Sequence, residues 1–121
     1  MPEATILVVD DDEVFLALTC RILIRHGYEV LRAKCSRQAL EVVNNNHPID
    51  LIVSDNQMPE MQGTDLISEI KQLSPQTPCV LMTGGVIESE KVPDGVTILR
   101  KPFSVQCLIY AVHAALAQPA S

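Results

Sequence analysis

Ile6-Leu7-Val8-Val9-Asp10-Asp11-Asp12 is the stretch that sets the architecture, because four apolar residues lead straight into three carboxylates. A short apolar run of this kind is typical of a strand buried on both faces of a sheet. Three further runs end beside a chemically useful side chain: Leu51–Ser54 before Asp55, Cys79–Met82 before Thr83, and Val96–Leu99 shortly before Lys101. If the strands are parallel, all four ends lie at the carboxyl edge, where open α/β sheets place their sites.

Strand-like and helix-like segments alternate along the chain. Apolar residues three or four apart predict amphipathic helices between the runs, with Phe15, Leu18 and Ile22 on the inward face of the first. Each helix follows a residue that can cap it: Asp12, Ser36, Thr64 and Ser104. A less apolar strand over Glu29–Ala33 suits a sheet edge. The pattern predicts an α/β fold, a doubly wound five-stranded parallel sheet with helices on both faces.

One connection is irregular. Between Gly84 and Gly95, only Val86–Val92 could form a helix, so the fourth helix is expected to be short or irregular. The length of 121 residues fits a single domain, 1–121, with a core over residues 5–117. No repeat or linker divides the chain.

Composition excludes several classes of function. The net charge of −6 makes direct nucleic-acid binding a poor hypothesis. No apolar stretch approaches the ~18 residues of a membrane span, and the first apolar run is too short for a signal peptide. The four cysteines form no C-x-x-C pair and are expected to be small buried hydrophobes; reduced thiols favour the cytoplasm. They are Cys20, Cys35, Cys79 and Cys107.

The three adjacent carboxylates repel one another, and desolvation increases that repulsion, so a cation should offset it. Mg²⁺ is the natural candidate, since it takes one or two carboxylates together with waters and phosphate oxygens. Asp12 can instead cap the following helix, which leaves Asp10 and Asp11 for the metal.

Asp55 ends the most apolar strand, and a carboxylate there can act as a nucleophile towards phosphorus. Lys101 could supply the cation that holds the incoming group, and the hydroxyl of Thr83 could donate to a phosphoryl oxygen. The isomer of the Lys101–Pro102 bond is left open by the sequence.

With these motifs in place, the chain resembles the receiver domain of two-component response regulators, the chemotaxis-regulator type included. The resemblance runs from Ile6 to about Leu116. It rests on Val8-Val9-Asp10-Asp11-Asp12, Asp55-x-x-Met58-Pro59-x-Met61-x-Gly63, Met82-Thr83-Gly84 and Lys101-Pro102-Phe103. It implies a flavodoxin-like fold with strand order 2-1-3-4-5.

The resemblance also implies roles for the site residues. Asp55 would be a phosphoacceptor that takes its phosphoryl group from a histidine kinase. Asp11, Asp55 and the backbone carbonyl of Gln57 would bind Mg²⁺, with Asp10 acting through water. Lys101 would pair with a phosphoryl oxygen, and Thr83 would report its arrival.

Such a domain is a signalling phosphoprotein rather than a true enzyme, since it catalyses only its own phosphorylation and dephosphorylation. Its expected partners are the kinase and a downstream protein, or an attached output or kinase domain. It would be a monomer or a weak dimer. The sequence leaves open whether it stands alone or belongs to a longer chain such as a hybrid sensor kinase.

The chain departs from the family pattern in three places. Ile98 stands where most receivers carry an aromatic residue, the segment between Thr83 and Lys101 is short, and Gln57 and Gly85 occupy positions that tune dephosphorylation. In the family these positions serve the relay of the signal and the lifetime of the phosphorylated state. Here the sequence leaves both open, whereas all the expected polar residues of the phosphate site are present.

Two alternatives remain. The first is a receiver-like adaptor that binds its partner without phosphorylation. The second is a haloacid-dehalogenase-like phosphatase, with Asp10 as nucleophile and Asp12 as acid/base. Those enzymes need a further acidic pair after the lysine, and no acidic residue follows Lys101.

Overall fold

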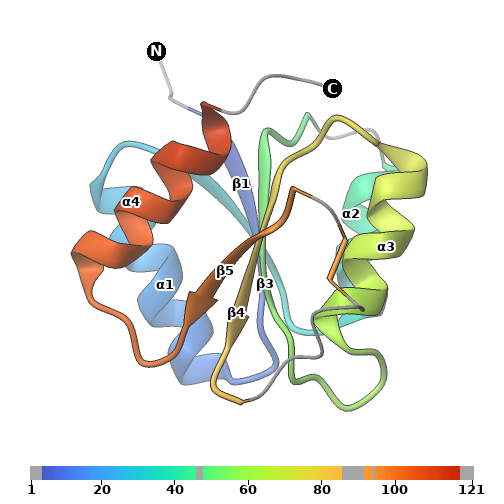
Figure 1. Ribbon diagram of the computed structural model, residues 1–121, viewed down its shortest axis with the longest axis horizontal. Coiled ribbons are helices and arrows are strands. Elements are labelled where there is room, and N and C mark those ends of the chain that lie inside the picture. Colours follow the sequence, from blue (N-terminus) through green and yellow to red (C-terminus); the bar gives the residue numbers. More distant parts are fainter. Residues whose placement is uncertain (1–3, 46–47, 86–91, 94, 118–121) are drawn as a thin grey trace.

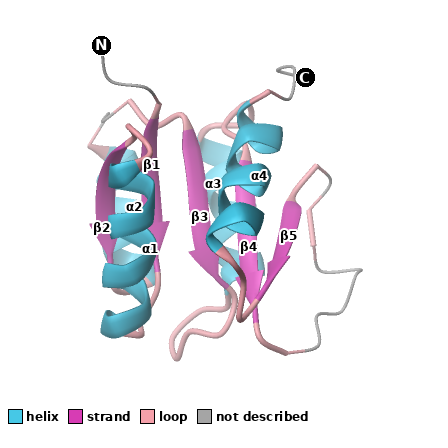
Figure 2. Cartoon of the chain, turned by 90° about the vertical axis from the view of Figure 1, so that its left-hand side faces the viewer, coloured by secondary structure: helices cyan, strands magenta, loops and turns pink. Residues whose placement is uncertain are grey.

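A parallel sheet of five strands forms the centre of the molecule. The computed structural model describes residues 4–45, 48–85, 92–93 and 95–117. The strands are β1 (Thr5–Val9), β2 (Glu29–Ala33), β3 (Leu51–Asp55), β4 (Cys79–Thr83) and β5 (Thr97–Arg100). Figure 2 shows their order, β2-β1-β3-β4-β5, with every neighbouring pair parallel. The predicted fold class and strand order are confirmed, and β2 lies at an edge as expected.

Alternation along the central strands explains why they are apolar throughout. On β1, Ile6 and Val8 belong to one hydrophobic core, whereas Leu7 and Val9 belong to the other. Because successive side chains of a strand point to opposite faces, a strand covered on both sides needs an apolar residue at every position. β3 and β4 follow the same rule until they reach Ser54, Asp55 and Thr83.

Helices cover the two faces in pairs (Figure 1). α1 (Glu13–Arg25) and α4 (Val105–Leu116) pack on one face, and α2 (Ser36–Asn44) and α3 (Gly63–Leu73) pack on the other. Among the described residues, no helix is long and apolar enough to cross a membrane. The short fourth helix predicted within Val86–Val92 falls mostly on residues outside the described ranges.

Two of the four predicted caps are confirmed. Asp12 accepts hydrogen bonds from the backbone nitrogens of Val14 and Phe15, at 3.0 and 3.1 Å, and so caps α1. Ser104 accepts from the nitrogen of Cys107 at 3.1 Å and caps α4.

The predictions for Ser36 and Thr64 are wrong. Ser36 is the first residue of α2, and its hydroxyl donates to the Met61 carbonyl at 3.3 Å. α3 begins at Gly63, and the buried side chain of Asn56 accepts from the nitrogen of Thr64 at 3.2 Å. In both cases the predicted capping residue bonds instead to a residue of another segment, Met61 for the Ser36 hydroxyl and Asn56 for the Thr64 nitrogen.

Two predictions about burial are also wrong. Leu18 is 50% exposed, because α1 turns Leu16, Cys20 and Leu23 towards the sheet. Cys107 is exposed on α4, while Cys20 and Cys79 are buried as expected and Cys35 is half-buried.

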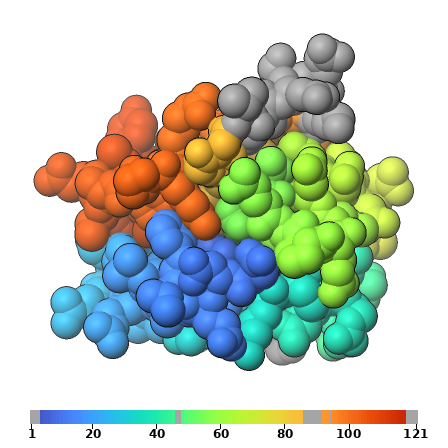
Figure 3. All heavy atoms as spheres, turned by 90° about the horizontal axis from the view of Figure 1, so that it is seen from below, coloured from blue at the N-terminus to red at the C-terminus, as the bar shows by residue number. Residues whose placement is uncertain are grey.

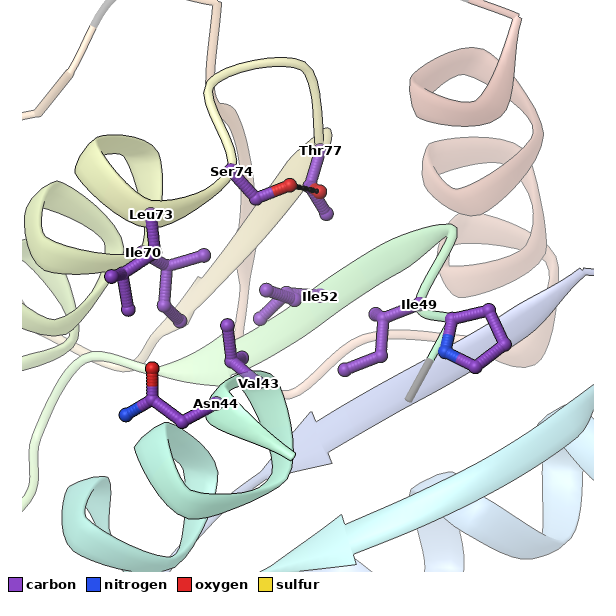
Figure 4. A pocket seen from close by; sticks show the side chains of 9 residues that line it. Val43, Asn44, Ile49, Ile52, Ile70, Leu73, Ser74 and Thr77 are labelled. Atoms are coloured by element: carbon purple, nitrogen blue, oxygen red, sulfur yellow. Dashed lines mark hydrogen bonds between the residues drawn. The ribbon is translucent and has the colours of Figure 1, made fainter. Parts of the chain in front are cut away.

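A pocket of about 480 Å³ opens at the amino end of β3, between α2 and α3 (Figure 4). Apolar side chains such as Val43, Ile52 and Ile70 line it, and Ser74 and Thr77 hydrogen-bond to each other on its wall at 2.6 Å. It lies at the edge of the sheet opposite to the predicted site.

Candidate functional site

The carboxyl edge of the sheet gathers the predicted site residues. Asp10 directly follows β1, Asp55 is the last residue of β3, Thr83 is the last of β4, and Lys101 directly follows β5. Figure 3 looks onto this edge, where the blue, green and orange segments of the chain meet. Asp10, Asp55 and Thr83 are buried. The parallel topology therefore brings together side chains that are up to 91 positions apart in the sequence.

Lys101 lies between two carboxylates. Its Nζ donates to Oδ2 of Asp10 at 3.0 Å and lies 3.2 Å from Oδ1 of Asp55. Its backbone nitrogen donates to the carbonyl of Thr83 at 2.7 Å, which fixes the start of the side chain beside β4. The Lys101–Pro102 peptide bond is cis. The ammonium is thus the cationic centre of this pocket.

Three carboxylates could share a metal ion. One oxygen from each of Asp10, Asp11 and Asp55 lies within 4.8 Å of the other two. The oxygens of Asp10 already have partners, since Oδ1 accepts from the nitrogen of Asp12 at 3.0 Å and Oδ2 accepts from Lys101. Asp11 is exposed.

Asp55 Oδ1 provides a test of whether this donor set suits a cation. It is fully buried and accepts no hydrogen bond among the described residues, so its approach to Lys101 is an ion pair without hydrogen-bond geometry. A hard divalent cation with oxygen ligands would satisfy such an atom. The residues present therefore fit Mg²⁺, with Asp11 and Asp55 better placed for direct contact than Asp10.

The pKa shifts in the pocket agree with a site that suits a cation. Burial raises the pKa of Asp55, the neighbouring Asp10 charge raises it further, and Lys101 only partly offsets both. Burial acts to lower the pKa of Lys101, but the hydrogen bond and charges of Asp10 and Asp55 outweigh it, so that this pKa is raised. The pocket thus carries more negative charge than one ammonium compensates.

Thr83 lies at the edge of the cluster. Its buried hydroxyl accepts from the nitrogen of Gly85 at 3.1 Å and donates to the Gly85 carbonyl at 3.3 Å. The structure places it on the predicted strand end, with its hydroxyl directed at the following loop rather than bonded to Asp55 or Lys101.

Gln57 reaches the same loop. A Cβ at Gly85 would lie 2.7 Å from the Gln57 side-chain nitrogen, so the missing side chain at Gly85 leaves room for this amide. The metal-ligand role of the Gln57 backbone carbonyl stays a prediction.

Sequence reasoning missed two contributors to the site. Phe15, taken as a packing residue, places its ring under Lys101, with Nζ 4.0 Å from the ring centroid. Asn56 holds the start of α3, with its carbonyl accepting from the nitrogen of Gly63 at 2.9 Å as well. Their positions in the sequence could have indicated both residues, since each follows within a few residues a strand that ends at the site.

Known proteins resemble this chain along most of its length. A family model described as response regulator receiver domain matches residues 6–113. The autoinducer 1 sensor kinase/phosphatase LuxN of Vibrio campbellii is 43% identical over 109 residues, covering 86% of this chain and 12% of that protein. The transcriptional regulatory protein GlrR of Escherichia coli K12 is 34% identical over 125 residues, covering 97% of this chain and 27% of that protein.

The fold has a close structural counterpart. A crystal structure of a response regulator receiver domain protein from Clostridium thermocellum matches with a TM-score of 0.85 and 33% identity, covering 94% of each chain. The family match covers the five strands, apart from the first residue of β1, and the edge where the carboxylates meet. The chain therefore belongs to the response regulator receiver domain family of two-component phosphorelay signalling.

Proposed function

We propose that this domain accepts a phosphoryl group on Asp55 from the phosphohistidine of a histidine kinase, with Mg²⁺ bound by Asp11 and Asp55. A carboxylate oxygen of Asp55 forms the new bond to phosphorus while the bond from phosphorus to the histidine nitrogen breaks. The released imidazole stays with the kinase. Hydrolysis of the acyl phosphate later returns Asp55 to a carboxylate.

The observation that carries the proposal is the arrangement around Lys101. A phosphoryl group spreads negative charge over three oxygens as it transfers, so catalysis depends on positioning and positive charge. Here the Lys101 ammonium lies within 3.2 Å of Asp55, inside a pocket that excludes most solvent. Mg²⁺ at Asp11 and Asp55 would supply the second positive charge, with Asp10 supporting it through water.

Roles for the remaining residues follow from their positions. The Thr83 hydroxyl would exchange its bonds to Gly85 for a phosphoryl oxygen, which couples phosphorylation to the loop after β4. The backbone carbonyl of Gln57 would complete the metal ligands.

The wider context of the domain is part of the proposal. We place it in the cytoplasm, with a histidine kinase as phosphodonor and either a separate protein or an attached domain as its target. Support for an attached domain comes from the relatives, since the chain spans 12% of the sensor kinase and 27% of the transcriptional regulator.

The test is labelling with acetyl phosphate in Mg²⁺, followed promptly by mass spectrometry of the protein and its fragments, because an acyl phosphate hydrolyses readily in acid and in base. We expect one phosphoryl group on Asp55, no label in Asp55→Asn, and normal labelling in the control Asp65→Asn, which changes an exposed aspartate on α3. Label on Asp10 would indicate the phosphatase alternative. A folded wild-type domain that takes no label, and shows no amide shift near Asp55 with beryllofluoride, would support the phosphorylation-independent adaptor.

A further inference from the structure

The ammonium of Lys101 has a third partner besides the two carboxylates. The face of the Phe15 ring lies 4.0 Å from Nζ. A cation over an aromatic face is attracted by the ring's negative potential, and the attraction grows when water is excluded. The Lys101 side chain keeps only 19% exposure, so this contact is of the stronger, desolvated kind.

The ring is itself held in place. The backbone nitrogen of Phe15 donates to Oδ1 of Asp12 at 3.1 Å, so the cap of α1 fixes the residue at the start of the helix. Phe103 meets the Phe15 ring edge-on, with centroids 5.3 Å apart and planes at 86°. The capping carboxylate and the second ring thus hold Phe15 before any ligand arrives.

We propose that Phe15 is a positioning residue that holds the Lys101 ammonium beside Asp55 through its aromatic face. A lysine side chain has many rotamers, and ordering it at the moment of reaction is unfavourable. Asp10, Asp55 and the ring together confine the ammonium before the phosphoryl group enters. This inference rests on the proposed function, because it assigns Phe15 a part in phosphorylation of Asp55.

The experiment replaces Phe15 with phenylalanines that carry one, two and three fluorines. Fluorine weakens the negative potential of the ring face while changing its shape little. If Phe15 had a purely structural role, the labelling rate would therefore not change with the number of fluorines. The rate of acetyl phosphate labelling at Asp55 should fall stepwise, reaching about threefold to tenfold with trifluoro-phenylalanine and with Phe15→Leu. Phe15→Tyr, which keeps the ring, should stay near the wild-type rate.

A spectroscopic readout accompanies the rates in the unphosphorylated protein. The ε-methylene protons of Lys101 should be shifted upfield by the ring current in wild type and in Phe15→Tyr, and should return to ordinary values in Phe15→Leu. Phe103→Leu removes one of the two supports of the Phe15 ring, so the upfield shift of its Lys101 protons should shrink but remain measurable.

The outcomes separate this inference from the proposed function. If wild type is labelled at Asp55 but the rates are equal along the fluorinated series, the role of Phe15 is overturned and the proposed function stands. Failure of wild type to be labelled would overturn the proposed function, and the role of Phe15 would fall with it. Unfolding transitions of every variant confirm that the rates compare folded proteins.

Discussion

Asp10 and Asp55 are both buried, but their surroundings differ. Asp10 has a hydrogen-bond partner on each oxygen, whereas the buried Oδ1 of Asp55 accepts none from the part of the chain that the structure describes. Burial and the charge of Asp10 therefore raise the pKa of Asp55, despite Lys101. A group that is harder to ionise in the folded state than in the unfolded state destabilises the fold whenever it is charged. The carboxylate proposed to accept the phosphoryl group is thus also a source of instability.

Asp55→Asn should therefore increase the free energy of unfolding at pH 7 in the absence of Mg²⁺, by an amount on the order of 1 kcal/mol. The destabilisation of wild type is complete above the raised pKa of Asp55 and disappears below its ordinary value of 3.8. The gain of the variant should accordingly shrink as the pH falls through this interval.

Urea unfolding of both proteins from pH 7 to pH 3.5 measures this difference, and Asp65→Asn serves as the control for loss of an exposed charge. A variant less stable than wild type at neutral pH would show that the Lys101 ion pair outweighs burial and carboxylate repulsion.

The start of α3 shows why a glycine lies eight positions after Asp55. A Cβ at Gly63 would lie 2.4 Å from the carbonyl oxygen of Asp55 and 2.9 Å from Cα of Asn56, and neither backbone atom can move away cheaply. The close approach lets Asn56 bond to the nitrogens of Gly63 and Thr64. Helix α3 and the end of β3 are therefore joined directly through backbone contacts.

Gly63→Ala should destabilise the domain by about 2–3 kcal/mol, because the added methyl group forces the loop after β3 away from α3. The same substitution at Gly84 is the matched control. Among the described residues, a Cβ there would meet only the Cβ of Lys101, at 3.9 Å, so Gly84→Ala should stay within about 0.5 kcal/mol of wild type. Thermal or urea unfolding measures both, and equal effects would contradict the steric argument.

Helix caps and buried helix faces show how far structure can be predicted from the pattern of neighbouring residues. Asp12 and Ser104 bond to nitrogens two or three residues ahead, so spacing predicts them. Asn56 bonds across eight positions, and nothing in the sequence around Thr64 indicates that a loop residue satisfies that nitrogen. Leu18 is exposed for a similar reason, since only the sheet decides which stripe of α1 faces inward.

The site as a unit was more predictable than its details. A parallel sheet sends every strand end to one edge, so four apolar runs sufficed to bring Asp10, Asp55, Thr83 and Lys101 together. Periodicity classed Phe15 with the core, and it does pack there. Its ring also lies under Lys101, because only three residues separate α1 from β1 at that same edge. A residue that both packs in the core and contacts the site depends on three-dimensional proximity, which the spacing of residues in the sequence does not reveal.

The proposed Mg²⁺ site is shared by separate strand ends, so we expect the stability of the fold to depend on the ion. Asp11 and Asp55 come together only when β1 and β3 pair, so the unfolded chain has no equivalent site. A ligand that binds only the folded state stabilises it, by about 2.7 kcal/mol at one hundred times its dissociation constant.

Titration of wild type with MgCl₂ should therefore raise its unfolding temperature steadily, and excess EDTA should reverse the increase. Asp11→Asn and Asp55→Asn should each abolish most of the increase, because each removes the negative charge of a carboxylate proposed to contact the ion directly. Asp65→Asn should respond as wild type does, since that exposed residue on α3 is not part of the cluster. Equal increases in all four proteins would mean that Mg²⁺ acts through general screening of a chain with net charge −6, and the shared site would then be excluded.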